Sequence, residues 1–238
     1  MRVTIDLEGA HPDILSRLRP GKHQIQGMIY AALGDSPYGR RHDLPRFKYF
    51  TFSDVFPVRD NVLFFTVSSP VAEIVQCVYD WVRQREVIHF GKGRYRVKRV
   101  RKYRSGVSER IKSGSPIVLY RDSRARRFFS LKTDGDFTFF MDRLKDNALK
   151  KYEAFTGESI EMDEPLFDEF ALRKEVVVQV QKRGQNDEDR SFIVIGSVWN
   201  TLIKQNVRGF KRLYQFLYDA GLGEKNSLGF GFVFPAGR

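Results

Sequence analysis

Apolar residues along the first half of the chain recur at every second position or at helical spacing. Residues 2–7 place three aliphatic side chains on one face, which predicts a β-strand. Residues 22–34 carry apolar side chains three and four positions apart and end in glycine, which is typical of an amphipathic helix. The same rules predict strands at 47–52, 62–67 and 92–104, and a helix that Ser69 caps and Pro70 opens. This order is β-α-β-β-α-β, the ferredoxin-like arrangement.

The second half repeats this order less clearly. Its apolar run at 191–203 fits a strand or a helix, and we favour a strand because four apolar side chains fall on one face. The polar stretch 104–115 marks the expected division into domains 1–108 and 109–238. We therefore predict an α+β protein of two tandem ferredoxin-like (RRM-like) domains. The further elements expected are strands at 116–120, 127–131, 172–180 and 230–234, a helix at 136–154, and a helix capped by Asn206.

Basic residues exceed acidic ones, and the formal net charge is +12. Residues 1–108 hold 19 Lys and Arg against 10 Asp and Glu, whereas residues 109–238 hold 22 against 19. The strand predicted at 92–104 carries eight basic residues and no acid. A charge excess of this size favours a polyanionic partner, either nucleic acid or an anionic membrane surface. Eight cations without a partner would repel one another, so nucleic acid is the better interpretation.

Several other classes of protein fit this sequence poorly. Cys77 is the only cysteine, which leaves no disulfide framework and no thiolate metal cluster. No apolar run approaches the roughly 18 residues of a membrane span, and the N-terminus has the pattern of a strand rather than a signal peptide. No acid pair or histidine cluster is suited to a metal. We expect a cytoplasmic protein with no membrane contact, no metal and no cofactor.

Residues 221–231 contain two Gly-apolar-Gly groups around a polar centre. Glycine permits positive φ and close approach of the backbone to a ligand, and successive exposed N–H groups form an anion site. Lys225 adds a cation, so phosphate is the expected guest. A structural turn is the alternative, because glycine pairs also end helices and begin strands. The dinucleotide fingerprint is excluded, because here a loop follows a helix and precedes a strand.

This glycine pattern resembles the C-terminal loop of the repeat-associated (RAMP) superfamily of CRISPR systems. The string from Gly223 to Gly231 is especially similar to the endoribonucleases that cut precursor CRISPR RNA within its repeats, the "Cas six" family. The resemblance implies two tandem ferredoxin-like domains over essentially the whole chain, and RNA as the partner. It leaves open a homodimer and other Cas proteins of an effector complex.

Three residues fit the chemistry of RNA cleavage without a metal. Such cleavage needs a group that holds the ribose 2′-OH, an acid for the departing 5′-oxygen, and a cation for the charge on the phosphate. By type and by resemblance, Tyr30, His42 and Lys48 are the candidates, with Tyr30 on the first helix and Lys48 opening an aromatic strand. His23 is the leading substitute for His42. The products would be a 2′,3′-cyclic phosphate and a 5′-OH.

Binding of the RNA is expected from the basic strand, the loop around the cut and the glycine-rich turn. The residues are Arg40, Arg41, Arg94, Arg96, Lys98, Arg101, Gly221, Gly223, Lys225, Asn226, Ser227, Gly229 and Gly231. The hypothesis is a metal-independent endoribonuclease acting on CRISPR repeat RNA. The alternatives are a catalytically inactive RNA-binding subunit of a CRISPR effector complex and an unrelated RRM-like nucleic-acid protein.

Overall fold

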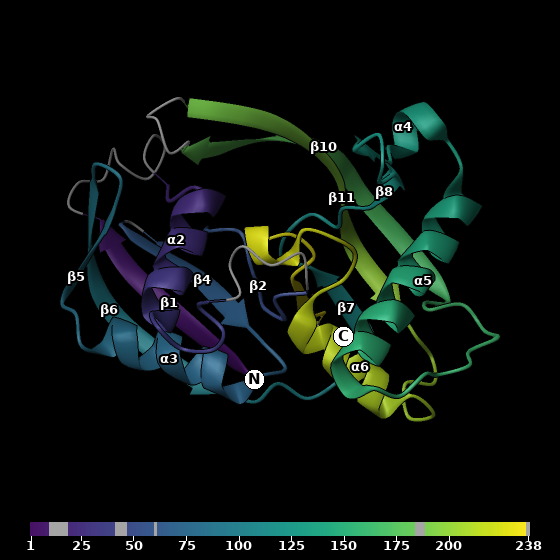
Figure 1. The fold of residues 1–238 in the computed structure, drawn as a ribbon, viewed down its shortest axis with the longest axis horizontal. Coiled ribbons are helices and arrows are strands. Elements are labelled where there is room, and N and C mark those ends of the chain that lie inside the picture. The colour runs from purple at the N-terminus through teal and green to yellow at the C-terminus, as the bar shows by residue number, and fades with distance from the viewer. Residues whose placement is uncertain (10–18, 41–46, 60, 184–188, 237–238) are drawn as a thin grey trace.

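The chain forms two α/β units that lie side by side, one from each half of the sequence (Figure 1). The computed structural model describes residues 1–9, 19–40, 47–59, 61–183 and 189–236. Each unit combines an antiparallel sheet with helices, so the predicted α+β class with tandem ferredoxin-like units is confirmed. The division between residues 108 and 109 stays a proposal of ours.

The first unit has the predicted β-α-β-β-α-β order with short additions. Its sheet runs β2-β4-β1-β6-β5, with β3 also paired to β4, so the first and last long strands are neighbours at the centre. The pairs of β1 with β4 and with β6 are antiparallel. The elements are β1 (Arg2–Gly9), α2 (Lys22–Leu33), β2 (Thr51–Phe52), β3 (Phe56–Arg59), β4 (Val62–Ser68), α3 (Ala72–Arg83), β5 (Val87–Phe90) and β6 (Gly93–Tyr103).

Both helices of this unit cover one face of its sheet, and the core lies between them (Figure 1). Alternate residues of β1, such as Ile5, point to the helices and are fully buried. Ile29 of α2 and Val78 of α3 meet them there, as the helical spacing predicts. The charged residues of β1 consequently lie on the opposite face of the sheet, because side chains alternate along a strand.

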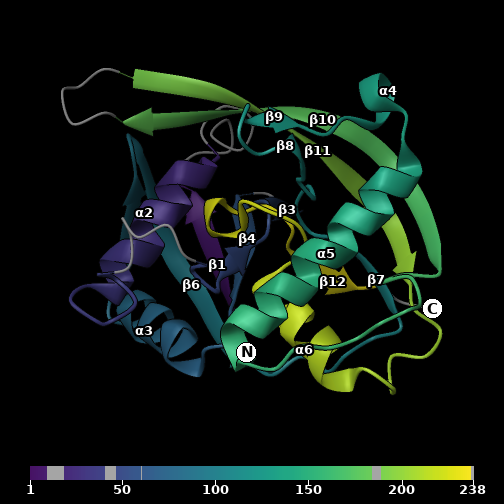
Figure 2. The same ribbon diagram turned by 45° about the vertical axis from the view of Figure 1, so that its right-hand side comes forward.

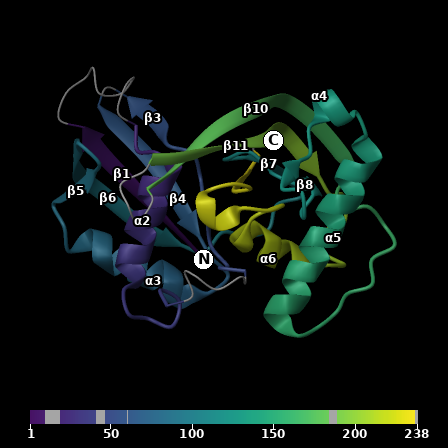
Figure 3. The ribbon, with the colours of Figure 1, turned by 45° about the horizontal axis from the view of Figure 1, so that its top comes forward.

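The second unit repeats this topology with a longer hairpin. Its sheet runs β10-β11-β7-β12, so the first strand again lies between the third and the last. The far end of β10 contacts α2, and the hairpin arches over the first unit (Figure 3). The elements are β7 (Arg110–Ser113), β8 (Tyr120–Asp122), β9 (Arg127–Phe128), α4 (Leu131–Asp134), α5 (Phe137–Thr156), β10 (Glu169–Arg183), β11 (Asp189–Ile203), α6 (Lys211–Ala220), the 3₁₀ helix η1 (Asn226–Leu228) and β12 (Val233–Pro235).

Strand β7 lies in the polar stretch 104–115, for which the sequence predicted no strand. Only Ile111 in this strand is apolar and buried, which gives no alternating pattern to detect. β7 is nevertheless central, because it pairs with both β11 and β12. The strands predicted at 116–120 and 127–131 form instead the separate β8–β9 hairpin and an isolated bridge from Ile117 to Ser197.

Two predicted helix starts were also wrong. Helix α3 begins at Ala72, and Ser69 accepts a hydrogen bond from the Val71 N–H instead of capping the helix. Helix α6 begins at Lys211 after Phe210, so Asn206 does not cap it. In both places a turn separates the favourable capping residue from the helix.

The strand predicted at 47–52 is mostly irregular. Tyr49 has φ +54°, which an extended strand does not allow. Its ring lies 4.9 Å from the ring of Phe155 in the second unit, whereas Phe50 is buried in the first core. Only Thr51–Phe52 and Phe56–Arg59 pair with β4. The strand at 191–203 was predicted correctly. The pairing of β1 with β6 shifts register at Lys98, which has no partner on β1.

Candidate functional site

The glycine-rich loop, residues 221–231, lies where the two units meet. The hydroxyl of Thr51 on β2 donates to the carbonyl of Phe230 at 2.9 Å. The ammonium of Lys22 at the start of α2 donates to the carbonyl of Gly229 at 2.6 Å. Both partners belong to the first unit. The loop of the second unit therefore contacts the start of α2, the helix that carries Tyr30, and strand β2, which follows Lys48 in the sequence.

The glycines of this loop are required by close packing. A Cβ on Gly229 would overlap the ring of Phe52, and one on Gly231 would overlap the carbonyl oxygen of Leu222. Both residues also have positive φ, +81° and +72°, which side chains disfavour. The glycine pattern therefore permits the two units to approach each other.

We expected the glycine N–H groups of this loop to be free to bind an anion, but most of them donate hydrogen bonds within the protein. The N–H of Gly221 donates to Leu217, that of Gly229 to Asn226, and that of Gly231 to Pro116. The four loop glycines are buried. Only the apex, residues 224–228, is half-buried, so Lys225, Asn226 and Ser227 are the loop residues that a ligand can reach.

Lys151 of α5 supports the loop from inside. Its ammonium donates to the carbonyls of Gly221 at 2.6 Å and Gly223 at 2.9 Å, and to Oδ1 of Asn226 at 2.8 Å. Three N–H donors thus meet three acceptors, which suits the protonated form. Burial nevertheless lowers the pKa of Lys151 to about 7, and the negative charge of Glu224 opposes that shift. The amide of Asn226 closes the loop by donating to Leu222 and Phe230.

Lys151 was not among the predicted site residues, although the sequence carries a signal for it. Leu144 and Ala148 occupy the buried face of α5, and Lys151 falls on the same face at helical spacing. A lysine at an apolar position of an amphipathic helix indicates a buried cation with a dedicated set of acceptors.

The structure brings Tyr30 and the segment of Lys48 together. Tyr30, in the last turns of α2, is half-buried, and its ring lies 5.6 Å from that of Phe50 in an edge-to-face contact. Lys48, also half-buried, is two residues before Phe50. Thr51 then contacts the glycine-rich loop. The segment 48–52 therefore connects both candidate residues to the loop.

The structure describes two of the four histidines, His23 and His89. His42 and its neighbour Arg41 lie outside the described residues, and so does His11. His23 lies in the first turn of α2, where its ring packs against Gly21. Seven residues are about two helical turns, so His23 and Tyr30 share one side of the helix about 10 Å apart. His89 is exposed on β5, away from this segment in the sequence.

The basic strand is partly neutralised by its neighbour. Lys98 forms an ion pair with Glu8 at 3.3 Å, and Arg101 with Asp6 at 3.4 Å. Both acids lie on β1, the neighbouring strand. The basic strand therefore carries less unpaired positive charge than its own sequence, which has no acid, indicated. Arg94 and Arg96 are exposed, and the ion pairs found among described residues include neither. Arg40 is exposed as well.

The described part of the chain shows neither a metal-binding cluster nor a membrane-spanning helix. No group of three or more His, Cys, Asp or Glu residues there is arranged to hold a metal ion. No helix in that part is long and apolar enough to cross a bilayer.

Comparisons with known proteins agree with the fold and the loop. Residues 99–234 match the family model described as "CRISPR associated protein Cas6, C-terminal". A curated protein of Methanocaldococcus jannaschii, "CRISPR-associated endoribonuclease Cas6 2", is 38% identical over 90% of this chain and 91% of its own length. The chain belongs to the Cas6 family. A second curated Cas6 of that organism, "CRISPR-associated endoribonuclease Cas6 1", is 27% identical over 98% of this chain and 92% of its own.

Solved structures of Cas6 proteins have the same fold. The product of a Cas6-related gene from Pyrococcus furiosus aligns with a TM-score of 0.70 at 18% identity, covering 99% of this chain and 98% of that chain. A "CRISPR associated protein Cas6" aligns at 0.65 with 24% identity, covering 100% and 99%. The agreement extends over both units, so this chain has the fold of its family throughout.

Proposed function

We propose that this Cas6-family chain is a metal-independent endoribonuclease that cuts CRISPR repeat RNA. The observation that carries the proposal is the contact of Tyr30 with Phe50, which joins the helix of Tyr30 to the segment of Lys48, and this segment also contacts the glycine-rich loop through Thr51. The curated relative that is 38% identical is itself named as a CRISPR-associated endoribonuclease. The fold and the basic surface support the same activity.

Each candidate side chain has a role in attack by the ribose 2′-OH. The hydroxyl of Tyr30 orients the 2′-OH, because an ordinary tyrosine, with pKa about 10, is a poor base. Lys48 stabilises the charge that grows on the phosphate. A histidine protonates the departing 5′-oxygen, since imidazole titrates near neutrality. His42 keeps this assignment as a prediction, and His23 is its alternative. The products are a 2′,3′-cyclic phosphate and a 5′-OH.

The RNA is held by the exposed arginines of β6 and by the apex of the glycine-rich loop. Arg94 and Arg96 are the strand residues most ready to bind phosphate, while Lys98 and Arg101 first have to leave their carboxylates. Phosphate contacts fix the position of the RNA without reading its sequence. A second copy of the chain, other Cas proteins and a cytoplasmic location stay predictions.

The test is a cleavage assay in excess EDTA with two RNAs. One is a CRISPR repeat from the genome that encodes this chain, and the other carries 2′-deoxyribose at the scissile nucleotide. We expect cleavage of the first alone. Retained binding with no cleavage of either RNA would identify the inactive RNA-binding subunit. Cleavage that EDTA abolishes would contradict the metal-independent chemistry.

Variants of the same enzyme test the residues. Tyr30→Phe keeps the ring contact with Phe50 and removes only the hydroxyl, so we expect a rate loss of about 100-fold with unchanged affinity. His42→Ala should slow cleavage and leave affinity nearly intact, whereas His23→Ala should do so only if His23 is the acid. A large loss of RNA affinity in His42→Ala would contradict its role as an acid.

A further inference from the structure

The β8–β9 hairpin, residues 120–128, is a compact basic element that lies under the long β10–β11 hairpin (Figure 2). It contains four arginines and one aspartate. In residues 109–238, Lys and Arg outnumber Asp and Glu by three. The hairpin alone has the same excess of three, so it accounts for the whole positive charge of the second half. Elsewhere in that half acids and bases balance, which marks the hairpin as distinct from an ordinary solvated surface.

Two of these arginines have structural partners. Arg127 forms an ion pair with Asp134 at 2.6 Å. Arg121 lies 3.5 Å from Asp136, with its guanidinium 4.1 Å from the centre of the Phe139 ring. Both side chains hold the hairpin to the region between β9 and α5. They are therefore poor candidates for binding a further ligand.

The other two arginines, Arg124 and Arg126, lie exposed at the turn. Within the described part of the chain, neither takes part in an ion pair. The carboxylate of Asp122 accepts from the backbone N–H groups of Arg124 and Ala125, at 2.8 and 3.0 Å. Asp122 therefore shapes the turn with its carboxylate, and both guanidinium groups stay available to solvent.

The hairpin is joined to the glycine-rich loop by defined contacts. The carboxylate of Glu224 accepts from the Tyr120 N–H at 2.9 Å and from Arg143 at 2.7 Å, and the Glu224 N–H donates to Val118. The rings of Tyr120 and Phe128 stack at 4.7 Å. The ammonium of Lys225 lies 5.4 Å over the Tyr120 ring. The apex of the loop and the hairpin are thus parts of one surface.

We propose that Lys225, Arg124 and Arg126 form a second phosphate-binding surface, which holds the backbone of the RNA strand beyond the glycine-rich loop. This inference rests on the proposed function, because it takes the same RNA as its ligand. Its three cations are presented by backbone turns and by a ring face. Binding there is electrostatic and independent of sequence.

The test compares two double variants that remove equal charge. Arg124→Ala with Arg126→Ala removes the exposed pair of the hairpin. Arg208→Ala with Arg212→Ala is the control, because both arginines are exposed, Arg212 on α6 and Arg208 three residues before that helix, and α6 lies away from β8 in the second unit (Figure 1). Affinity is measured against a fully 2′-O-methylated repeat RNA, which has no nucleophile, at several salt concentrations. Thermal unfolding checks that each variant is folded.

We expect the hairpin variant to bind several-fold more weakly and to lower the slope of log affinity against log salt by about 1.4, at about 0.7 for each lost phosphate contact on a single strand. The control should keep the slope of the unmodified protein. Equal slopes in all three proteins, or equal losses in both variants, would overturn the inference. Cleavage of unmethylated repeat RNA by the unmodified protein reports separately on the proposed function. No cleavage and no binding by that protein would overturn both.

Discussion

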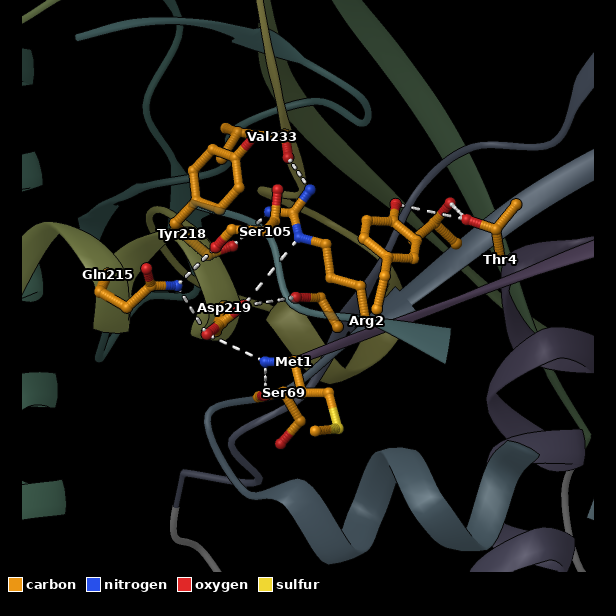
Figure 4. A network of polar contacts seen from close by, with 12 residues as sticks. Met1, Arg2, Thr4, Ser69, Ser105, Gln215, Tyr218, Asp219 and Val233 are labelled. Atoms are coloured by element: carbon orange, nitrogen blue, oxygen red, sulfur yellow. Dashed lines mark hydrogen bonds and ion pairs between the residues drawn. The ribbon is translucent and has the colours of Figure 1, made fainter. Parts of the chain in front are cut away.

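The Nη2 of Arg2 lies 2.6 Å from the carbonyl oxygen of Tyr218, with the guanidinium 3.9 Å from the centre of that residue's ring (Figure 4). Arg2 belongs to the central strand of the first unit and Tyr218 to α6 of the second. The Nη1 of Arg2 donates to the carbonyl of Val233 at 2.8 Å, and Asp219 lies 4.0 Å from Nε. A fully buried cation thus fastens the two units together.

Removal of this cation should loosen the contact between the units. We expect Arg2→Ala to lower the free energy of unfolding by about 3 kcal/mol, because it leaves the buried carbonyl oxygens of Tyr218 and Val233 without their donor. Arg2→Lys should recover only part of this loss, since an ammonium cannot reproduce the planar fork. Urea unfolding measures the effect. Arg99→Ala on exposed β6 is the control and should change stability by less than about 0.5 kcal/mol. Equal stability of Arg2→Ala and Arg99→Ala would contradict the role of Arg2.

The glycine-rich loop allows backbone strain to be separated from crowding. Gly231 and Gly135 have similar φ, +72° and +65°, but a Cβ on Gly135 meets nothing within 4 Å. Gly135→Ala should therefore cost only the left-handed conformation, about 1 kcal/mol. Gly231→Ala adds the overlap with Leu222 and should cost more than about 2 kcal/mol, measured by thermal and urea unfolding. Comparable losses at both positions would show that packing at the loop is not the reason for its glycines.

Lys151 should make stability depend on pH. Its pKa is about 7 in the folded protein against an ordinary value near 10.5, so between these values the unfolded chain binds more protons. The contribution of Lys151 to the free energy of unfolding therefore rises with pH across this window, and it is lost again as the pH falls to 7. We expect a gain of about 2 kcal/mol from pH 7 to 9, at a limit of about 1.4 kcal/mol per unit.

Urea unfolding at pH 7, 8 and 9 checks this dependence, and Lys151→Met is the reference because it cannot titrate. The variant should be less stable at every pH, since it leaves the carbonyls of Gly221 and Gly223 without a donor, and its pH slope should be flat by comparison. The range stops at pH 9 because burial raises the pKa of Tyr214, which introduces the opposite trend above pH 10. Parallel pH slopes in the two proteins would place the pKa of Lys151 near its ordinary value.

The acids of β1 should restrain RNA binding. Asp6 neutralises Arg101, so Asp6→Asn removes a negative charge beside the basic strand and frees that guanidinium. We expect RNA affinity to rise several-fold, with a steeper dependence on salt. Asp163→Asn is a suitable control, since Asp163 is exposed in the second unit and precedes β10. Unchanged affinity in Asp6→Asn would remove Arg101 from the list of RNA contacts.

The sequence predicted the helices and strands whose apolar residues follow a clear period. Residues 22–34 became α2 with Ile25 and Ile29 buried, and residues 191–203 became β11. It also identified the family, because two Gly-apolar-Gly groups at a fixed spacing are a long pattern. Tyr30 lies on the first helix, as predicted. Each of these features is local, so neighbouring residues are enough to specify it.

Features that depend on residues distant in the sequence became visible only in the tertiary structure. Strand β7 has one buried apolar residue and exists because β11 and β12 pair with it. The glycine N–H groups, predicted to bind phosphate, are used in hydrogen bonds to Leu217 and Pro116. The charge of Arg101 is balanced by an acid 95 residues away in the chain. Hydrogen bonds and ion pairs act through space, so a linear pattern cannot show which donors and charges the fold has already satisfied.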